Sequence, residues 1–247
     1  MSKANFDQLK SEAYTRLRGC SPSLCDFLTR RLHISPHDRI LDLGCGPGEN
    51  TALMAGLTRA RVEGLDLDDE RIRFARESNP ALTFHAANAE ALPFSHGNFT
   101  GVTMMLSVQR FRDRAKVLNQ VSRVLGQGGR VGIATVSPGQ LAARPDLRAF
   151  PTALRMECER FPAVSVLREE LARHGFAGIA VERFSEVIRP LDATFVRWLE
   201  DYPFTALKHI PPDEFRDGLQ AIRASIQYAT TVQLLTDECT VITATKP

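Results

Sequence analysis

Three glycines on alternate positions, directly after an apolar run, form the most informative feature of the chain. They are Gly44, Gly46 and Gly48, and the run before them is residues 39–43. Glycine has no Cβ, so a ligand can lie against its main chain, and it adopts φ values that other residues avoid. A helix expected from Glu49 would direct its free N–H groups toward the same place. The pattern predicts a strand, a ligand-binding turn and a helix, in that order.

The spacing of these glycines distinguishes two kinds of nucleotide site. A dinucleotide site requires G-x-G-x-x-G, but the sixth position counted from Gly44 is Glu49. The motif that remains is D-x-G-x-G-x-G, from Asp42 to Gly48. It resembles motif I of the class I S-adenosylmethionine-dependent methyltransferases. The resemblance implies S-adenosyl-L-methionine as cofactor, with its methionine tail against Asp42, Gly44, Cys45, Gly46 and Gly48.

A carboxylate on the next expected strand fits the other half of such a site. Asp66 lies near the end of the strand-like run of residues 61–67, 20 positions after Gly46. In adenosine-binding sheets, a carboxylate about 20 residues beyond the glycine turn accepts hydrogen bonds from the ribose hydroxyls. We therefore predict that Asp66 binds the ribose, with Leu67 beside it. Asp68 is placed to cap the following helix instead.

Two later segments resemble the small-molecule group of the same family. Residues 88–94 stand where that group has an Asp-Ala-Glu-x-Leu-Pro-Phe run, whose first residue meets the adenine amino group. Asn88 replaces the aspartate, but its carbonyl oxygen can still accept a hydrogen bond. The resemblance thus implies that Asn88 and Ala89 hold the adenine. Residues 124–130 match the family's Val-Leu-x-Pro-Gly-Gly turn.

Residues 105–111 resemble the Ala-Val-Gln-Trp segment of the malonyl-carrier-protein and trans-aconitate methyltransferases, both of which methylate a carboxylate. In these relatives the segment runs from the methionine part of the cofactor toward the acceptor. The resemblance implies that Leu106 contacts the cofactor and that Gln109 and Arg110 contact the acceptor. The alternative is a solvated loop that leads into the next helix.

The chemistry requires little of the protein beyond positioning. The sulfonium methyl group is already electrophilic, so the protein must hold an acceptor in line with it. Gln109 and His209 are weak candidates for a catalytic group, and the other histidines have structural explanations. We identify no catalytic base, expect no metal, and add Trp198 as a candidate for acceptor binding. Gln109, Trp198 and His209 all lie between residues 105 and 212.

The order of elements predicts the fold that must carry these residues. Strands and helices alternate from residue 39, which favours an α/β, Rossmann-like, doubly wound and mostly parallel seven-stranded sheet with helices on both faces. The expected strands are residues 39–43, 61–67, 82–87, 101–107, 130–136, 179–184 and 239–246. Two short helices are expected before the first strand, over residues 9–17 and 24–32. Further helices are expected over 117–125 with a stop at Gly126–Gly129, and over 164–174 with a stop at Gly175.

The expected domain organisation has four parts. Residues 1–34 form N-terminal helices, 35–189 the cofactor-binding core, 190–235 a helical lid, and 236–247 the final strand of the core sheet. The lid is predicted because a connection of this length between two strands is uncommon and carries the only tryptophan. Ligands bind at the carboxyl ends of the strands in such sheets, where a lid would shape the acceptor pocket.

Composition narrows the class of protein. A net charge of +2 without a long basic run gives no sign of a nucleic-acid or membrane partner. Five cysteines without C-x-x-C spacing indicate neither a disulfide framework nor a zinc site. We expect a cytoplasmic monomer or homodimer that acts on a small molecule. The alternatives are a cofactor-binding module without catalysis, a protein or nucleic-acid methyltransferase, and an aminopropyl-transferring relative.

Overall fold

The computed structural model describes residues 21–201 and 205–247, and it divides into two units. The first, the sheet unit, comprises the described residues up to Thr135 together with Val164–Phe184 and Thr240–Pro247. The second unit comprises Val136–Ala163 and Ser185–Cys239. The first of the two helices expected at the N-terminus lies outside the described residues. The second is α2 (Pro22–Arg31).

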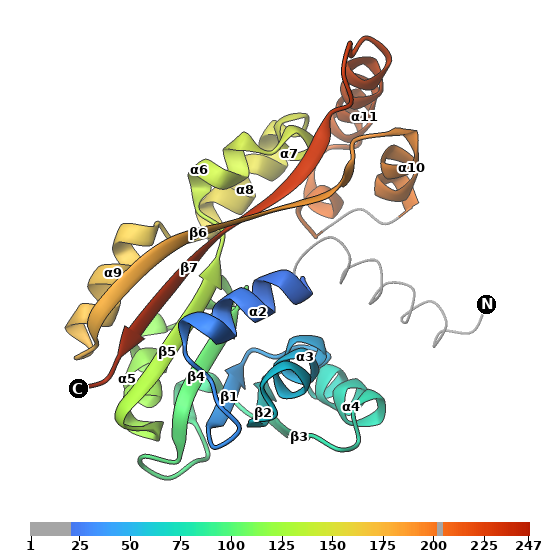
Figure 1. Cartoon of the computed structure of the whole chain (residues 1–247). Helices are drawn as coiled ribbons and strands as arrows, with labels where there is room; N and C mark the ends of the chain where they lie inside the picture. Colours follow the sequence, from blue (N-terminus) through green and yellow to red (C-terminus); the bar gives the residue numbers. More distant parts are fainter. Residues whose placement is uncertain (1–20, 202–204) are drawn as a thin grey trace. The chain divides into compact units, whose positions relative to one another are not determined.

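Seven strands form one sheet in the order β3-β2-β1-β4-β5-β7-β6 (Figure 1). The strands are β1 (Arg39–Leu43), β2 (Arg61–Asp66), β3 (Thr83–Ala86), β4 (Phe99–Met105), β5 (Leu125–Thr135), β6 (Ala177–Pro190) and β7 (Leu234–Thr245). Pairs among β1 to β5 are parallel, whereas β7 runs antiparallel to β5. This is the predicted doubly wound, mostly parallel sheet.

The strand order reverses between β1 and β4, which lie side by side although two strands separate them in sequence. In open α/β sheets, ligands bind in the crevice outside the carboxyl ends of the strands at such a point. The residues after Leu43 and after Met105 therefore flank the place where a ligand is expected. Both segments belong to the sheet unit.

Helices cover both faces of the sheet. In the sheet unit these are α2, α3 (Glu49–Thr58), α4 (Asp69–Ser78), α5 (Arg114–Val124) and α9 (Val164–Arg173), with 3-10 turns η1 (Ala89–Ala91) and η2 (Val108–Arg110). Helix α2 lies against α3, and α5 lies against α9, on different faces (Figure 1). The predicted apolar stripe of α5 is buried, at Val117, Leu118, Val121 and Val124.

One predicted helix stop was wrong. We expected the glycines of residues 126–129 to end α5, but α5 ends at Val124 and Leu125 is already extended, with ψ +136°. Leu125 is fully buried, so packing decides its conformation before the glycines are reached. Gly128, at φ +72°, instead donates its N–H to the Lys246 carbonyl at 2.9 Å. Gly175 does close α9, at φ +83°.

Strands β6 and β7 are longer than the sequence indicated. Strand β6 continues to Pro190, beyond the expected end at Phe184, and β7 begins at Leu234 in place of Cys239. Exposed and half-buried residues alternate from Val181 to Val187 with the period of a strand. Because several of these side chains are charged or polar, the alternation does not show as a hydrophobic pattern.

The second unit contains α6 (Pro138–Ala143), α7 (Pro145–Arg148), α8 (Pro151–Arg160), α10 (Ala193–Asp201), η3 (Thr205–His209) and α11 (Pro212–Gln227). The predicted helices of the insertion are thus present. They pack with residues 136–163, which we had assigned to the core. Phe215 stacks on Phe150 with ring centroids 5.9 Å apart, and Glu214 Oε1 accepts the Thr152 N–H at 2.7 Å. The lid role stays a prediction.

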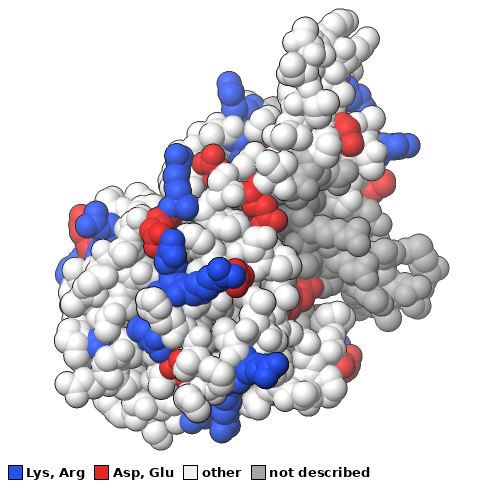
Figure 2. Space-filling model, in the orientation of Figure 1, with Lys and Arg blue, Asp and Glu red and all other residues white. Residues whose placement is uncertain are grey.

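On the face drawn in Figure 2, the described surface has no large patch of a single charge, because Lys and Arg side chains are interspersed with Asp and Glu. A nucleic-acid-binding face would be expected to gather one sign of charge. Within the described residues, no helix is both long and apolar enough to span a bilayer.

Candidate cofactor site

The turn between β1 and α3 has the backbone that its glycines predict. Gly44, Gly46 and Gly48 have φ values of +78°, +55° and +86°, in the left-handed region where L side chains are strained. The N–H groups of Gly44 and Cys45 donate to the Leu65 carbonyl of β2 at 2.7 and 3.0 Å. We call residues 44–48 the glycine loop. These two hydrogen bonds tie it to the neighbouring strand.

The three glycines differ in what surrounds the position that a Cβ atom would take. A Cβ on Gly44 would lie 2.5 Å from Ser107 Cβ, and one on Gly48 would lie 2.8 Å from the Phe84 ring. These two glycines are therefore needed by the protein's own packing, and their contact with the cofactor stays a prediction. A Cβ on Gly46 would meet nothing within 4 Å. Only Gly46 of the three presents bare backbone to open space.

Asp66 joins the glycine loop to the end of β2. Its Oδ2 accepts the Gly46 N–H at 2.8 Å, and its Oδ1 accepts the Asp68 N–H at 3.0 Å. A carboxylate can accept about four hydrogen bonds, so two positions remain for ribose hydroxyls. Leu67 follows with its apolar side chain 71% exposed. Asp68 caps α4 as predicted, since its Oδ1 accepts from the backbone of Glu70 and Arg71.

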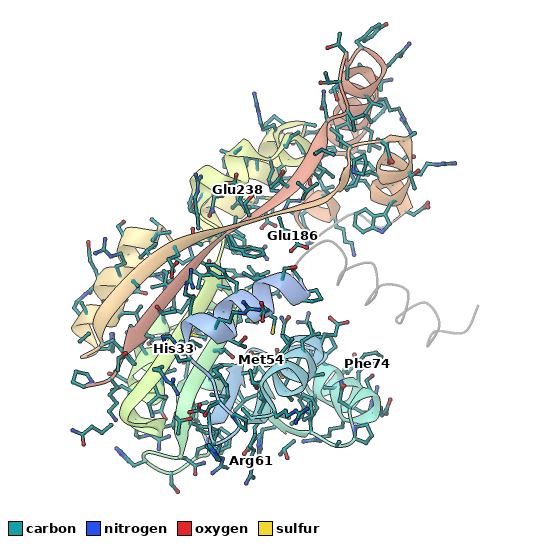
Figure 3. The ribbon with its side chains drawn as sticks, in the orientation of Figure 1. His33, Met54, Arg61, Phe74, Glu186 and Glu238 are labelled. Carbon is teal, nitrogen blue, oxygen red and sulfur yellow. The ribbon has the colours of Figure 1, made fainter. Side chains whose placement is uncertain are left out.

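Asp42 is a buried support beneath the loop. Its oxygens accept hydrogen bonds from Thr51 Oγ1 at 2.7 Å and Thr103 Oγ1 at 3.2 Å. The same Thr103 hydroxyl lies 3.6 Å from the sulfur of Met54, labelled on α3 in Figure 3. Burial raises the pKa of Asp42 to about 6; the two hydroxyls oppose this rise, and the negative charge of Asp66 adds to it. Asp42 thus fixes β1, α3 and β4 to one another.

Cys45 is not a nucleophile. Its side chain is 7% exposed, and burial, with the negative charges of Asp42 and Asp66, raises the pKa of its thiol far above the usual range. A thiol is reactive as the thiolate, which this environment disfavours. Cys45 instead packs in a small cluster with Ile72, Ala75 and Phe84 under the loop.

The segment after β4 meets the loop from the other side. Ser107 Oγ donates to the Leu43 carbonyl at 2.7 Å, and Leu106 N–H donates to the Ala134 carbonyl at 2.8 Å. Leu106 has φ +51°, which is uncommon for a residue other than glycine. Gln109 Nε2 donates to the Leu106 carbonyl at 2.6 Å. Arg110 is exposed.

Asn88 is exposed and is the N-cap residue of η1. Its Oδ1 accepts the Glu90 N–H at 2.9 Å, which starts η1. An amide oxygen has a second lone pair, so this bond is compatible with the predicted contact to adenine. Ala89 beside it is buried.

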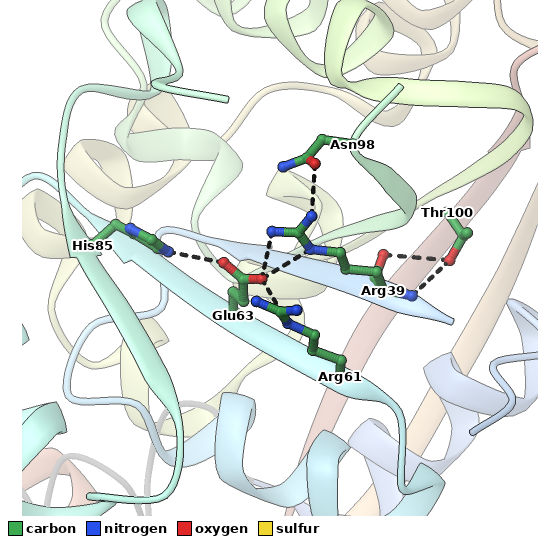
Figure 4. A network of polar contacts seen from close by, with 6 residues as sticks. All are labelled: Arg39, Arg61, Glu63, His85, Asn98 and Thr100. Carbon is green, nitrogen blue, oxygen red and sulfur yellow. Dashed lines mark hydrogen bonds and ion pairs between the residues drawn. The ribbon is translucent and has the colours of Figure 1, made fainter. Parts of the chain in front are cut away.

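Two histidines considered as catalytic bases, His85 and His174, lie within hydrogen-bond distance of other groups of the protein. His85 Nε2 lies 2.9 Å from Glu63 Oε2, and Arg39 and Arg61 pair with the same carboxylate (Figure 4). This network lies toward the amino ends of β1 and β2, away from the glycine loop. His174 Nδ1 lies 2.6 Å from the Glu170 carbonyl oxygen.

Two predicted acceptor contacts belong to the second unit. His209 is exposed in η3, and Trp198 of α10 stacks on Phe195 with ring centroids 6.1 Å apart. The sheet unit therefore holds every predicted cofactor residue, together with Gln109 and Arg110.

The supporting hydroxyls Thr51, Thr103 and Ser107 were missed in the sequence. Each lies one helical turn beyond the glycines or near the end of β4, and each bonds a group of β1. A hydroxyl residue directly after a binding motif was the available signal.

Comparison with known proteins finds methyltransferases similar to this chain. Residues 40–129 match the model of a methyltransferase domain. The chain is 34% identical to an O-methyltransferase of Penicillium expansum over 67% of this chain and 63% of that protein. It is 28% identical to the 27-O-demethylrifamycin SV methyltransferase of Amycolatopsis mediterranei over 84% of this chain and 79% of that protein. It therefore spans less than two thirds of the length of the first of these relatives.

A solved structure shares the fold. The phosphoethanolamine N-methyltransferase 2 of Haemonchus contortus, solved with phosphomonomethylethanolamine and S-adenosylhomocysteine, has a TM-score of 0.61 and 18% identity. The likeness covers 95% of this chain and 56% of that one. The glycine loop and Asp66 lie within residues 40–129, the segment that matches the methyltransferase domain model. Residues 40–129 of this chain thus match a methyltransferase domain, in agreement with the resemblance seen in the D-x-G-x-G-x-G motif.

Proposed function

We propose that this protein transfers a methyl group from S-adenosyl-L-methionine to an oxygen atom of a small-molecule acceptor. The observation that carries the proposal is the hydrogen bond from Gly46 N–H to Asp66 Oδ2. It brings the bare backbone of the glycine loop and the predicted ribose acid together within the family-matched segment. Oxygen is favoured as the acceptor atom because of the names of the two relatives. One is named an O-methyltransferase, and the other is named a methyltransferase of 27-O-demethylrifamycin SV.

The residues present fit the cofactor. The open space at Gly46 admits a methionine tail against the main chain, and Asp66 keeps free lone pairs for two ribose hydroxyls. The exposed Leu67 offers an apolar surface beside Asp66 for the adenosine. Asn88 and Ala89 would hold the adenine, and Leu106 the methionine side. When bound, the cofactor supplies an electrophilic methyl group.

The protein's own contribution is positioning. Asp66 and the Leu65 carbonyl accept hydrogen bonds from the glycine loop itself. Asp42 and Ser107 fix the elements on either side of the loop, through Thr51 of α3 and the Leu43 carbonyl of β1. Holding two reactants in line can lower a barrier by about 7–11 kcal/mol. His85 and His174 are occupied by Glu63 and the Glu170 carbonyl, which favours a reaction without a histidine base at those positions.

The acceptor contacts form the finer part of the proposal. Residues 190–235 would act as the lid, with Trp198 and His209 toward the acceptor, and Arg110 would meet it from the sheet unit. A lid of this kind excludes water from the reacting atoms. A cofactor-binding module without catalysis is the alternative, because it would need the same loop and the same Asp66.

Methyl transfer from isotopically labelled S-adenosyl-L-methionine tests the function. The protein is incubated with a panel of phenols, alcohols, quinone-like compounds and carboxylates, and label is sought in the extracted small molecules. Label in a hydroxyl-bearing acceptor, lost in Asp66→Ala, is the expected result. Binding of the cofactor product without transfer to any member of the panel would favour the module that does not catalyse.

A further inference from the structure

The side-chain oxygen of Gln109 is a buried acceptor without a donor. Among the described residues, Oε1 is closed to solvent and has no hydrogen-bond partner. The orientation of the amide is fixed, because Nε2 donates to the Leu106 carbonyl at 2.6 Å. Turning the amide over would place two oxygens against each other at that distance. A buried acceptor without a donor is costly, and such atoms usually have a partner in the working protein.

Gln109 belongs to a segment that packs directly on the first glycine of the loop. A Cβ at Gly44 would lie 2.5 Å from Ser107 Cβ and 3.9 Å from the Phe111 ring. Ser107 Oγ also donates to the Leu43 carbonyl, the last residue of β1. Residues 106–111 therefore line the side of the glycine loop that faces β4.

The backbone before Gln109 is strained and held in place. Leu106 adopts φ +51° although it is not a glycine. Strained residues of this kind persist only where their surroundings fix them, and they gather at functional sites. Here the Leu106 N–H is bound by Ala134 and its carbonyl by Gln109. The position of the Gln109 amide is thus set by the end of β4 and not by a freely moving loop.

We propose that Gln109 Oε1 accepts a hydrogen bond from the α-ammonium group of the cofactor's methionine tail, an inference that rests on the proposed function. An ammonium group carries three N–H donors and a positive charge, and a charged donor forms a stronger bond than a neutral one. The glycine loop beside Gln109 is where the tail would lie. Gln109 is then a cofactor-binding residue that anchors the amino-acid end of the ligand, and Arg110, not Gln109, is left for the acceptor.

Calorimetric titration with two ligands tests this assignment. One ligand is S-adenosyl-L-homocysteine, and the other is its analogue that lacks the α-amino group. The variant is Gln109→Met, which removes both polar atoms at similar size. In the wild-type protein the amino group should strengthen binding about tenfold to a hundredfold.

The expected result is a specific loss of that preference. Gln109→Met should bind S-adenosyl-L-homocysteine about tenfold or more weakly than the wild type, while its affinity for the desamino analogue stays unchanged. Unchanged affinity for the analogue also shows that the variant is folded; should Gln109→Met not fold, Gln109→Asn, one methylene shorter, gives the same comparison.

Two results overturn the inference in distinguishable ways. If the wild type and Gln109→Met show the same preference for the amino group, Gln109 does not bind the ammonium, and the proposed function stands. If the wild type binds neither ligand, the proposed function fails and the inference fails with it.

Discussion

Gly46 and Asp66 are joined by a hydrogen bond of 2.8 Å from the Gly46 N–H to Asp66 Oδ2, although 20 residues separate them. Gly46 belongs to the turn after β1, and Asp66 is the last residue of β2. This hydrogen bond connects the two predicted halves of the cofactor site. Asp66 has two tasks, holding the loop and accepting from a ribose, because a carboxylate has lone pairs for both.

Gly46→Ala and Gly48→Ala should separate ligand binding from folding. Both glycines have positive φ, which costs an L residue about 1–2 kcal/mol. A Cβ on Gly48 would in addition press on Phe84 and Ala75, at 2.8 and 3.0 Å, and overpacking adds about 1–3 kcal/mol. We expect Gly48→Ala to lose more unfolding free energy, measured in urea. Gly46→Ala should lose more affinity for S-adenosyl-L-homocysteine. Equal effects of both variants on both measurements would contradict this division.

Asp42→Asn should change how stability depends on pH. The pKa of Asp42 is about 6 in the folded protein against an ordinary value of 3.8. Because the folded value is raised, the folded state binds the proton more tightly than the unfolded one. The stability that Asp42 contributes is complete below pH 4 and declines as pH rises through 6.

The measurement compares unfolding free energies of the wild type and Asp42→Asn at pH 4 and pH 7.5. The shift of roughly two pKa units corresponds to about 3 kcal/mol. Relative to the wild type, Asp42→Asn should therefore gain up to about 3 kcal/mol of stability between the two pH values. Other titrating groups cancel in this difference. A stability difference that does not vary with pH would show that the pKa of Asp42 is not raised.

Asn88 gives a test of the adenine contact. Asn88→Asp should preserve or strengthen cofactor binding, because a charged acceptor forms stronger hydrogen bonds and can still cap Glu90. Asn88→Leu should weaken binding by the loss of the acceptor. Calorimetry on the three proteins decides the matter. Three equal affinities would place the adenine elsewhere.

The lid prediction can be examined with Trp198, the only tryptophan of the chain. Binding of S-adenosyl-L-homocysteine with an acceptor identified in the labelling panel should change its fluorescence and slow amide exchange across residues 190–235. The reason is that lids become ordered when both ligands are present. The cofactor product alone serves as the control. Unchanged exchange with both ligands bound, in a protein that turns over, would remove the lid.

The fold and the loop were predictable because they depend on local pattern. The alternation of apolar runs and helices gave β1 with correct bounds, and the glycine spacing gave the positive φ values. What the sequence could not show depends on tertiary contacts. Gly44 and Gly48 pack closely against Ser107 and Phe84, which are distant in sequence. The extended conformation of Leu125 likewise depends on tertiary neighbours. The polar extension of β6 likewise has no hydrophobic pattern to reveal it.

Asp66→Ala, compared with Asp68→Ala, tests the central claim most directly. Asp68 is a matched control, because it lies two residues away and its carboxylate caps α4 and pairs with Arg71 of the same helix. Calorimetric titration with S-adenosyl-L-homocysteine should show a loss of about tenfold to a hundredfold in Asp66→Ala, since bonds to a charged acceptor contribute about 1.5–3 kcal/mol. Asp68→Ala should bind as the wild type does. Equal affinity of Asp66→Ala and the wild type would contradict the account.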